Sequence, residues 1–209
     1  MYKFTIPHNE YLGQEIQAFY HTDFPGWQNP GNPDYINILK NNYGDDSKFI
    51  LDSAVQKLEG VLRDDLPHIM QSLQLNSLTV CVVPRAKAVA IYQPNQLLFK
   101  STVRNVVNQL NGFYDGTDYI IRHTSTRTTH LRRPRWGYNN DGPIPYRGIT
   151  TATCNISDNV RGRDILLIDD VYTSGVNIDE DAIQALLDNG AHSVTFYAVG
   201  RTVRTHFNI

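Results

Sequence analysis

The chain has 209 residues, a formal net charge of -2 at pH 7 and 41% hydrophobic residues. This length is enough for one substantial α/β core with a smaller attached element, but two full domains would be crowded. The net negative charge argues against a protein built mainly to bind nucleic acid. The sequence has no apolar run of about eighteen residues, so we expect no contact with a membrane. It shows no export signal, which predicts a cytoplasmic location.

Residues 1–75 are predicted to be mostly helical and to form an N-terminal helical segment. Residues 26–34 interrupt this segment with two glycines and two prolines, which are incompatible with regular structure. Further along, apolar residues recur at steps of three and four, which predicts one buried helix face with a kink or a break at Pro67. This face consists of Val55, Leu58, Leu62, Leu66, Ile69 and Leu73.

Residues 76–209 alternate short apolar strands with amphipathic helices, which predicts an α/β domain with a mostly parallel sheet flanked by helices. The predicted strands are 78–83, 118–122, 148–156, 163–169 and 193–199. The predicted helices are 99–110 and 178–189. Residues 123–147 have no periodicity and contain three prolines, so they are predicted to be a loop. Such a long loop in a compact domain is usually functional.

The most informative segment is residues 165–177, where a buried strand leads into two carboxylates, a turn with hydroxyl groups and a glycine, and then a helix. In open α/β sheets, ligands bind beyond the carboxyl ends of the strands. Gly175 and the helix N-terminus would suit a phosphate, while Asp169 and Asp170 would suit hydroxyls or a divalent cation. A phosphorylated sugar satisfies both conditions. The residues alone leave a simple helix-capping turn as the alternative.

This segment resembles the phosphoribosyl pyrophosphate loop of type I phosphoribosyltransferases, which has apolar residues, two acidic residues, two apolar residues and a Thr/Ser-rich turn containing glycine. The wider similarity covers roughly residues 78–203 and is closest to the ComF-like and amidophosphoribosyltransferase-like branch. The resemblance implies that Asp169 and Asp170 hold the ribose hydroxyls and act in catalysis. It also implies a wrap around the 5-phosphate, formed by Val171, Tyr172, Thr173, Ser174, Gly175, Val176 and Asn177. Asn177 departs from the family, which has Thr or Ser there.

The resemblance also implies a ligand, a metal and further binding residues. The ligand would be phosphoribosyl pyrophosphate or a nucleotide, accompanied by Mg²⁺ that Asp169 and Asp170 could contact, and a homodimer is expected. Residues 83–88 stand where the family has its pyrophosphate-binding loop, although the usual glycine is missing. The candidate pyrophosphate contacts are Arg85, Ala86, Lys87 and, after the last strand, Arg201. The alternative for residues 85–87 is an exposed polar turn.

A basic cluster without any acidic residue lies within residues 122–135. Its candidate functional members are Arg127, Arg132, Arg133 and Arg135. In the family, a flexible loop at this position closes over the substrate and excludes water. Contacts with RNA, DNA or a protein partner, or a solvated loop without a direct role, are the alternatives.

Together these features predict a phosphoribosyltransferase that transfers the 5-phosphoribosyl group to or from a nitrogen acceptor such as a nucleobase. No motif specifies the acceptor, and by elimination the base-recognising element, or hood, would come from residues 1–75. The alternative is a non-catalytic regulator or effector that senses phosphoribosyl pyrophosphate or a nucleotide, which the glycine-poor loop 83–88 favours. A nucleic-acid-binding module built on residues 122–135 is a third interpretation.

Overall fold

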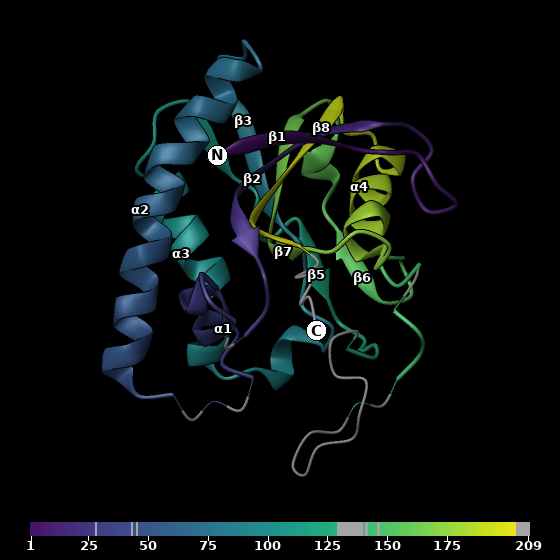
Figure 1. The fold of residues 1–209 in the computed structure, drawn as a ribbon. Helices are drawn as coiled ribbons and strands as arrows, with labels where there is room; N and C mark the ends of the chain where they lie inside the picture. Colours follow the sequence, from purple (N-terminus) through teal and green to yellow (C-terminus); the bar gives the residue numbers. More distant parts are fainter. Residues whose placement is uncertain are drawn as a thin grey trace, which may run out of the picture.

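A six-stranded mixed sheet forms the centre of the molecule (Figure 1). The computed structural model describes residues 1–27, 29–42, 44, 46–128, 140, 142–145 and 147–203. The strands of this sheet are β1 (Tyr2–Ile6), β2 (Ile16–Phe24), β3 (Leu78–Val82), β4 (Phe113–Asp115), β7 (Asp164–Tyr172) and β8 (Ser193–Thr202). Their spatial order is β1-β2-β8-β7-β3-β4. Only β1 pairs antiparallel with its neighbour, so the predicted α/β class with a mostly parallel sheet is confirmed.

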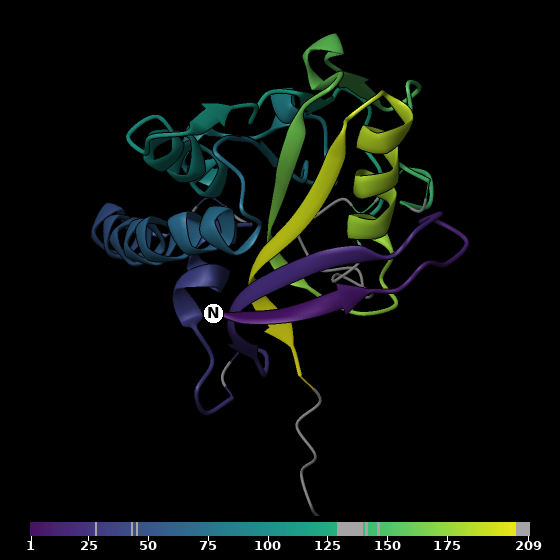
Figure 2. The same cartoon turned by 90° about the horizontal axis from the view of Figure 1, so that it is seen from above.

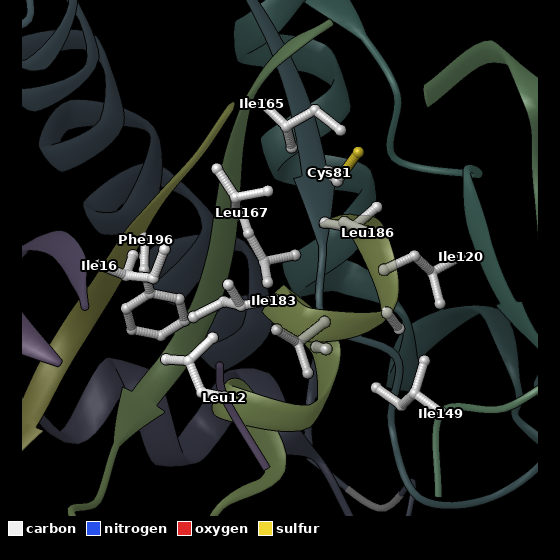
Figure 3. Close-up of a cluster of buried hydrophobic side chains, with 14 of the residues drawn as sticks. Leu12, Ile16, Cys81, Ile120, Ile149, Ile165, Leu167, Ile183, Leu186 and Phe196 are labelled. Atoms are coloured by element: carbon white, nitrogen blue, oxygen red, sulfur yellow. The ribbon is translucent and has the colours of Figure 1, made fainter. Parts of the chain in front are cut away.

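Helices cover both faces of the sheet (Figure 2). On one face lie α1 (Asp34–Lys40), α2 (Lys48–Ser72) and α3 (Leu98–Val107), and on the other lies α4 (Ile178–Asp188). Successive residues of β7 point to opposite faces, so Leu166 packs under the first group whereas Leu167 packs under α4. Figure 3 shows the cluster on the α4 side, where side chains of β7, β8 and α4 meet. None of the described helices is long and apolar enough to cross a membrane.

A second, two-stranded sheet lies beside the main one. It pairs β5 (Ile120–Arg122) antiparallel with β6 (Cys154–Ile156), and it joins the two ends of the long connection 123–153. Single turns of 3₁₀-helix occur at Val89–Ile91, Pro94–Gln96 and Asp158–Val160. The strand predicted at 118–122 thus belongs to this small sheet, and the main sheet instead takes β4, which was not predicted. Of the strand predicted at 148–156, only the last three residues are a strand.

The prediction that residues 1–75 are mostly helical is wrong for residues 1–24. These residues form β1 and β2, and β2 pairs in parallel with β8, so the beginning of the chain completes the same sheet as residues 78–202. The physical reason is the pairing itself, because strand formation depends on partners that are distant in sequence. The helical prediction is confirmed further on, where α2 passes through Pro67 as one helix and buries the predicted face.

Candidate functional site

The carboxyl ends of four parallel strands meet at one edge of the sheet and open onto a cavity of about 350 Å³. Phe24 of β2, Val83 after β3 and Thr202 of β8 lie in its wall. The wall also contains several of the predicted site residues, namely Asp169, Asp170, Val171, Thr173, Val176, Arg85 and Ala86. The structure therefore brings part of the predicted phosphoribosyl segment and part of the predicted pyrophosphate loop together on one cavity. Four predicted residues of the segment are not in the cavity wall, namely Tyr172, Ser174, Gly175 and Asn177.

The turn that follows β7 presents hydrogen-bond donors. Strand β7 continues to Tyr172, so the two aspartates lie within it rather than after it. A tight turn then closes with the N–H of Val176 donating to the carbonyl of Thr173 at 3.1 Å, and Gly175 has a φ of +81° that L side chains disfavour. Within the part of the chain that the structure describes, the N–H groups of Ser174, Gly175 and Asn177 donate to no other group. They are available to an anion.

Asn177 stands where the turn leads into α4. It precedes α4 in the left-handed conformation, with φ of 61°, and its side chain does not cap the helix. Its Oδ1 accepts from Asn9 Nδ2 at 3.3 Å, which ties the β1–β2 connection to the turn. Its own Nδ2 donates to the carbonyl of Gly175 at 3.4 Å. The helix-capping alternative is thus met in position, with Asn177 at the N-cap and acidic residues in the first turn, but Asn177 makes no side-chain hydrogen bond to the helix.

The last strand contributes a hydroxyl that the sequence did not indicate. The Oγ1 atoms of Thr173 and Thr202 are 2.6 Å apart and share a hydrogen bond, and both residues line the cavity. Arg201, the predicted pyrophosphate contact, points the other way because neighbouring strand residues face opposite sides. Its guanidinium lies over the rings of Phe4, at 4.5 Å, and Tyr20, at 5.4 Å.

The two predicted carboxylates have different environments. Asp170 Oδ1 is 3.2 Å from the ammonium of Lys40, the last residue of α1. Burial and the charge of Asp170 raise the pKa of Asp169 to about 7. Asp179, in the first turn of α4, is only 5% exposed, and burial together with the charge of Asp169 raises its pKa well above the usual value. The cavity therefore contains one carboxyl group paired with a lysine, beside two carboxyl groups whose pKa values are raised.

The acidic first turn of α4 holds its surroundings in place. Glu180 Oε1 accepts from the hydroxyl of Tyr172 at 3.1 Å, so this predicted phosphate-loop residue packs beneath α4 and not in the cavity wall. Asp181 Oδ2 accepts from the N–H of Ile149 at 2.9 Å, close to where the long connection returns to β6. Acidic side chains at a helix N-terminus also interact favourably with the helix dipole.

The predicted pyrophosphate loop is anchored rather than exposed. Arg85 donates to Asn42 Oδ1 at 2.7 Å and to the carbonyl of Gln96, and its guanidinium lies 4.4 Å from the ring centre of Tyr92. Lys87 is 7% exposed and lines a smaller, mainly apolar cavity of about 70 Å³ beside the larger one. The alternative of an exposed polar turn is therefore wrong for both basic residues.

The basic cluster of residues 122–135 is described only in part. Arg122 is 4% exposed, and it joins the two sides of the site by donating to the carbonyls of Arg85 and Gly148, each at 2.8 Å. Arg127 is exposed and donates to the carbonyl of Gly142 at 3.0 Å. The remaining candidates, Arg132, Arg133 and Arg135, lie outside the described residues.

Comparison with known protein families finds no family model that matches the chain, and no curated protein matches it. Among the described residues, no group of three or more His, Cys, Asp or Glu side chains is arranged to hold a metal ion. The fold and the site define an α/β protein with a mostly parallel sheet and a cavity at its carboxyl edge. The wall of this cavity contains carboxyl groups and part of a donor-rich turn.

Proposed function

We propose that the protein is a phosphoribosyltransferase, which binds phosphoribosyl pyrophosphate with Mg²⁺ and transfers the 5-phosphoribosyl group to or from a nitrogen acceptor such as a nucleobase. The observation that carries the proposal is the meeting of two carboxyl groups, those of Asp169 and Asp170, with Thr173 and Val176 of the following turn in the wall of one cavity. That cavity, of about 350 Å³, falls within the range of small-molecule sites, which is roughly 300–1,000 Å³.

The 5-phosphate would bind at the turn. The unpaired N–H groups of Ser174, Gly175 and Asn177 point to this role because successive backbone donors before a helix form an anion site. The hydroxyl of Thr173 would add a donor from the side. The turn 173–177 contains no lysine, so recognition of the 5-phosphate would depend on main-chain donors and the helix dipole.

The ribose hydroxyls would donate to Asp169 and Asp170, which accept hydrogen bonds when ionised. The same two residues fit Mg²⁺, because this ion is usually bound in such sites by one or two carboxylates together with the phosphates of the substrate. When bound, Mg²⁺ would neutralise and orient the diphosphate. The negative charge of Asp170 would also favour the positive charge that develops on the sugar during transfer.

In the transfer step, the bond from the sugar C1 to the diphosphate oxygen breaks, and a bond from C1 to the acceptor nitrogen forms. The electron pair of the broken bond leaves with the diphosphate, and the acceptor nitrogen loses a proton. The residues of the cavity would mainly hold the two reactants in position and stabilise charge.

A regulator or effector that senses phosphoribosyl pyrophosphate or a nucleotide is the second candidate. The observation that favours it is the environment of Arg85, whose guanidinium is held by Asn42, the Gln96 carbonyl and the ring of Tyr92. A loop anchored in this way has less freedom to engage a leaving diphosphate. The two candidates share the same ligand and differ in turnover.

The test is isothermal titration of the purified protein with phosphoribosyl pyrophosphate and Mg²⁺, followed by assay of pyrophosphate release with a panel of nucleobases. Magnesium-dependent binding with base-dependent release is the expected result for the transferase. Binding without release from any base would favour the sensor. Absence of binding would contradict both candidates.

A further inference from the structure

The large cavity has an acidic wall and few cations to meet a diphosphate. Among the residues that the structure describes, the cationic side chains in its wall are Lys40 and Arg85. Arg85 is fixed by its contacts with Asn42, the carbonyl of Gln96 and the ring of Tyr92. Lys40 forms an ion pair with Asp170 Oδ1, and its side chain is 22% exposed. Lys40 is therefore the cation with the greater freedom to follow a ligand.

The main chain at Lys40 is held firmly. Helix α1 ends there, and Asn41 takes the left-handed conformation and is 2% exposed. Asn41 Nδ2 donates to the carbonyl of Asn95 at 3.2 Å, and Gln96 Nε2 donates to the carbonyl of Asn41 at 3.1 Å. These bonds join the end of α1 to the connection before α3. They fix the base of a long side chain whose ammonium can still turn within the cavity.

Lys40 is paired with Asp170, a carboxyl group that would also bind the ribose hydroxyls of the ligand. Its ammonium lies 3.2 Å from Asp170. Ribose hydroxyls that donate to Asp170 would satisfy this carboxylate, and a diphosphate carries more negative charge than one carboxylate and would compete for the ammonium. Mg²⁺ would offset part of the repulsion between the diphosphate and the carboxyl groups of Asp169 and Asp170, and the ammonium of Lys40 would offset more of it.

We propose that Lys40 binds the diphosphate group of the ligand, moving from Asp170 to the diphosphate when the ligand enters. This inference rests on the proposed function, and it assigns to α1 a specificity role that no motif indicates. Lys40 would distinguish ligands that carry a diphosphate from those that carry only the 5-phosphate.

The test compares two probes on the wild-type protein and on Lys40→Gln. Phosphoribosyl pyrophosphate with Mg²⁺ carries the diphosphate, and ribose 5-phosphate lacks it. We expect Lys40→Gln to lose roughly tenfold or more in affinity for phosphoribosyl pyrophosphate, because a charge-assisted hydrogen bond to phosphate is removed. Affinity for ribose 5-phosphate should change by less than about twofold. Lys40→Arg, which keeps the charge, should retain most of the affinity for phosphoribosyl pyrophosphate.

Lys48→Gln is the matched control, because Lys48 is an exposed lysine that pairs with Asp52 on the outside of α2. Lys40→Met, which keeps the apolar stem, replaces Lys40→Gln if that variant does not fold. Equal losses for both probes, or no loss for either, would overturn the role of Lys40 while leaving the phosphoribosyl site in place. Failure of the wild-type protein to bind either probe would overturn the proposed function and this inference together.

Discussion

The buried carboxyl groups of Asp179, in the first turn of α4, and Asp169, near the end of β7, interact closely enough that each changes the pKa of the other. Burial is the largest cause of the raised pKa of each group. The charge of Asp170 also raises the pKa of Asp169, which reaches about 7. Asp179 Oδ1 is also buried without a hydrogen-bond partner within the described residues. Because the pKa of Asp179 is raised well above its usual value and that of Asp169 to about 7, we expect Asp179 to be the group of this pair that keeps its proton near neutral pH.

This pair predicts that the protein becomes less stable as the pH rises. A carboxyl group whose pKa is raised in the folded state retains its proton where the unfolded chain has lost it. For Asp169, the contribution of this bound proton to stability is complete below the unfolded pKa of 3.8 and is lost as the pH rises through about 7. We therefore expect Asp179→Asn to be more stable than the wild-type protein at pH 8, by about 1–2 kcal/mol, since an amide needs no proton to donate.

Urea unfolding at pH 5, 7 and 8.5 measures this difference. The variant should show a smaller decline in the free energy of unfolding with pH than the wild-type protein. Asp158→Asn serves as the control, because the side chain of Asp158 is 90% exposed. If the wild-type protein and Asp179→Asn lose stability in parallel, the pair does not share a proton.

Local patterns predicted much of the fold. The apolar runs at 163–169 and 193–199 lie within β7 and β8, and the stepwise apolar residues before Leu73 lie in α2. These elements can be recognised from the apolar pattern of their own residues. Residues 16–24 do not alternate cleanly, and their burial in β2 depends on pairing with β8, which lies far along the chain. Sequence patterns near β2 do not contain that information.

The candidate site was predictable where its residues are adjacent in sequence. Asp169, Asp170 and Thr173 line one cavity as the motif indicated. Lys40 and Thr202 come from other elements and were missed. Arg201 was predicted as a pyrophosphate contact, but its guanidinium lies over Phe4 and Tyr20, whereas Thr202 lines the cavity. Because β8 extends to residue 202, beyond its predicted end, the sequence did not indicate which face each residue takes.

Asp170→Asn is expected to weaken the binding of phosphoribosyl pyrophosphate by roughly tenfold or more, because it removes a charged acceptor for the ribose hydroxyls. The fold should change little, since the pair with Lys40 is partly exposed and such pairs contribute about 1 kcal/mol or less. Isothermal titration measures the affinity. Asp164→Asn, at the opposite end of β7, is the matched control. Equal affinities for Asp170→Asn and the wild-type protein would remove Asp170 from the site.

A buried polar contact between α2 and the sheet predicts a second stability effect. The hydroxyl of Tyr197 donates to Asp65 Oδ2 at 2.8 Å, and His21 Nδ1 lies 2.9 Å from the same oxygen. Burial alone would raise the pKa of Asp65, but the hydrogen bonds from His21 and Tyr197 outweigh burial and lower it. The stability that Asp65 contributes is therefore present at neutral pH and lost as the pH falls below about 4.

Tyr197→Phe should consequently reduce the free energy of unfolding by about 1.5–3 kcal/mol at pH 7, because a buried carboxylate loses one donor. The difference from the wild-type protein should shrink in strong acid, below the lowered pKa of Asp65, where this group is protonated in the folded protein as well. Urea unfolding at pH 7 and pH 2 provides the measurement. Tyr114→Phe, on a tyrosine that is 56% exposed, is the control. A loss of the same size at both pH values would mean that packing, and not the bond to Asp65, stabilises this contact.

Gly175→Ala tests whether the turn 173–177 binds phosphate, and its effect on binding can be distinguished from its effect on backbone strain. Gly175 has a φ of +81° and a Cβ there would meet no other atom within 4 Å, so the added methyl costs only backbone strain in the folded protein. We expect a loss of about 1 kcal/mol in the free energy of unfolding. The methyl would also hinder close approach of a phosphate to the turn, and binding of ribose 5-phosphate should fall by roughly tenfold.

Gly162→Ala is closely matched, because Gly162 has a φ of +68° and a Cβ there also meets nothing within 4 Å. Gly162 lies just before β7, at the edge of the sheet opposite the cavity. The two variants should therefore lose similar stability in urea unfolding, and only Gly175→Ala should lose affinity in titrations with ribose 5-phosphate. If both variants bind ribose 5-phosphate as the wild-type protein does, the phosphate does not bind at the turn 173–177, and the N–H groups there serve another ligand.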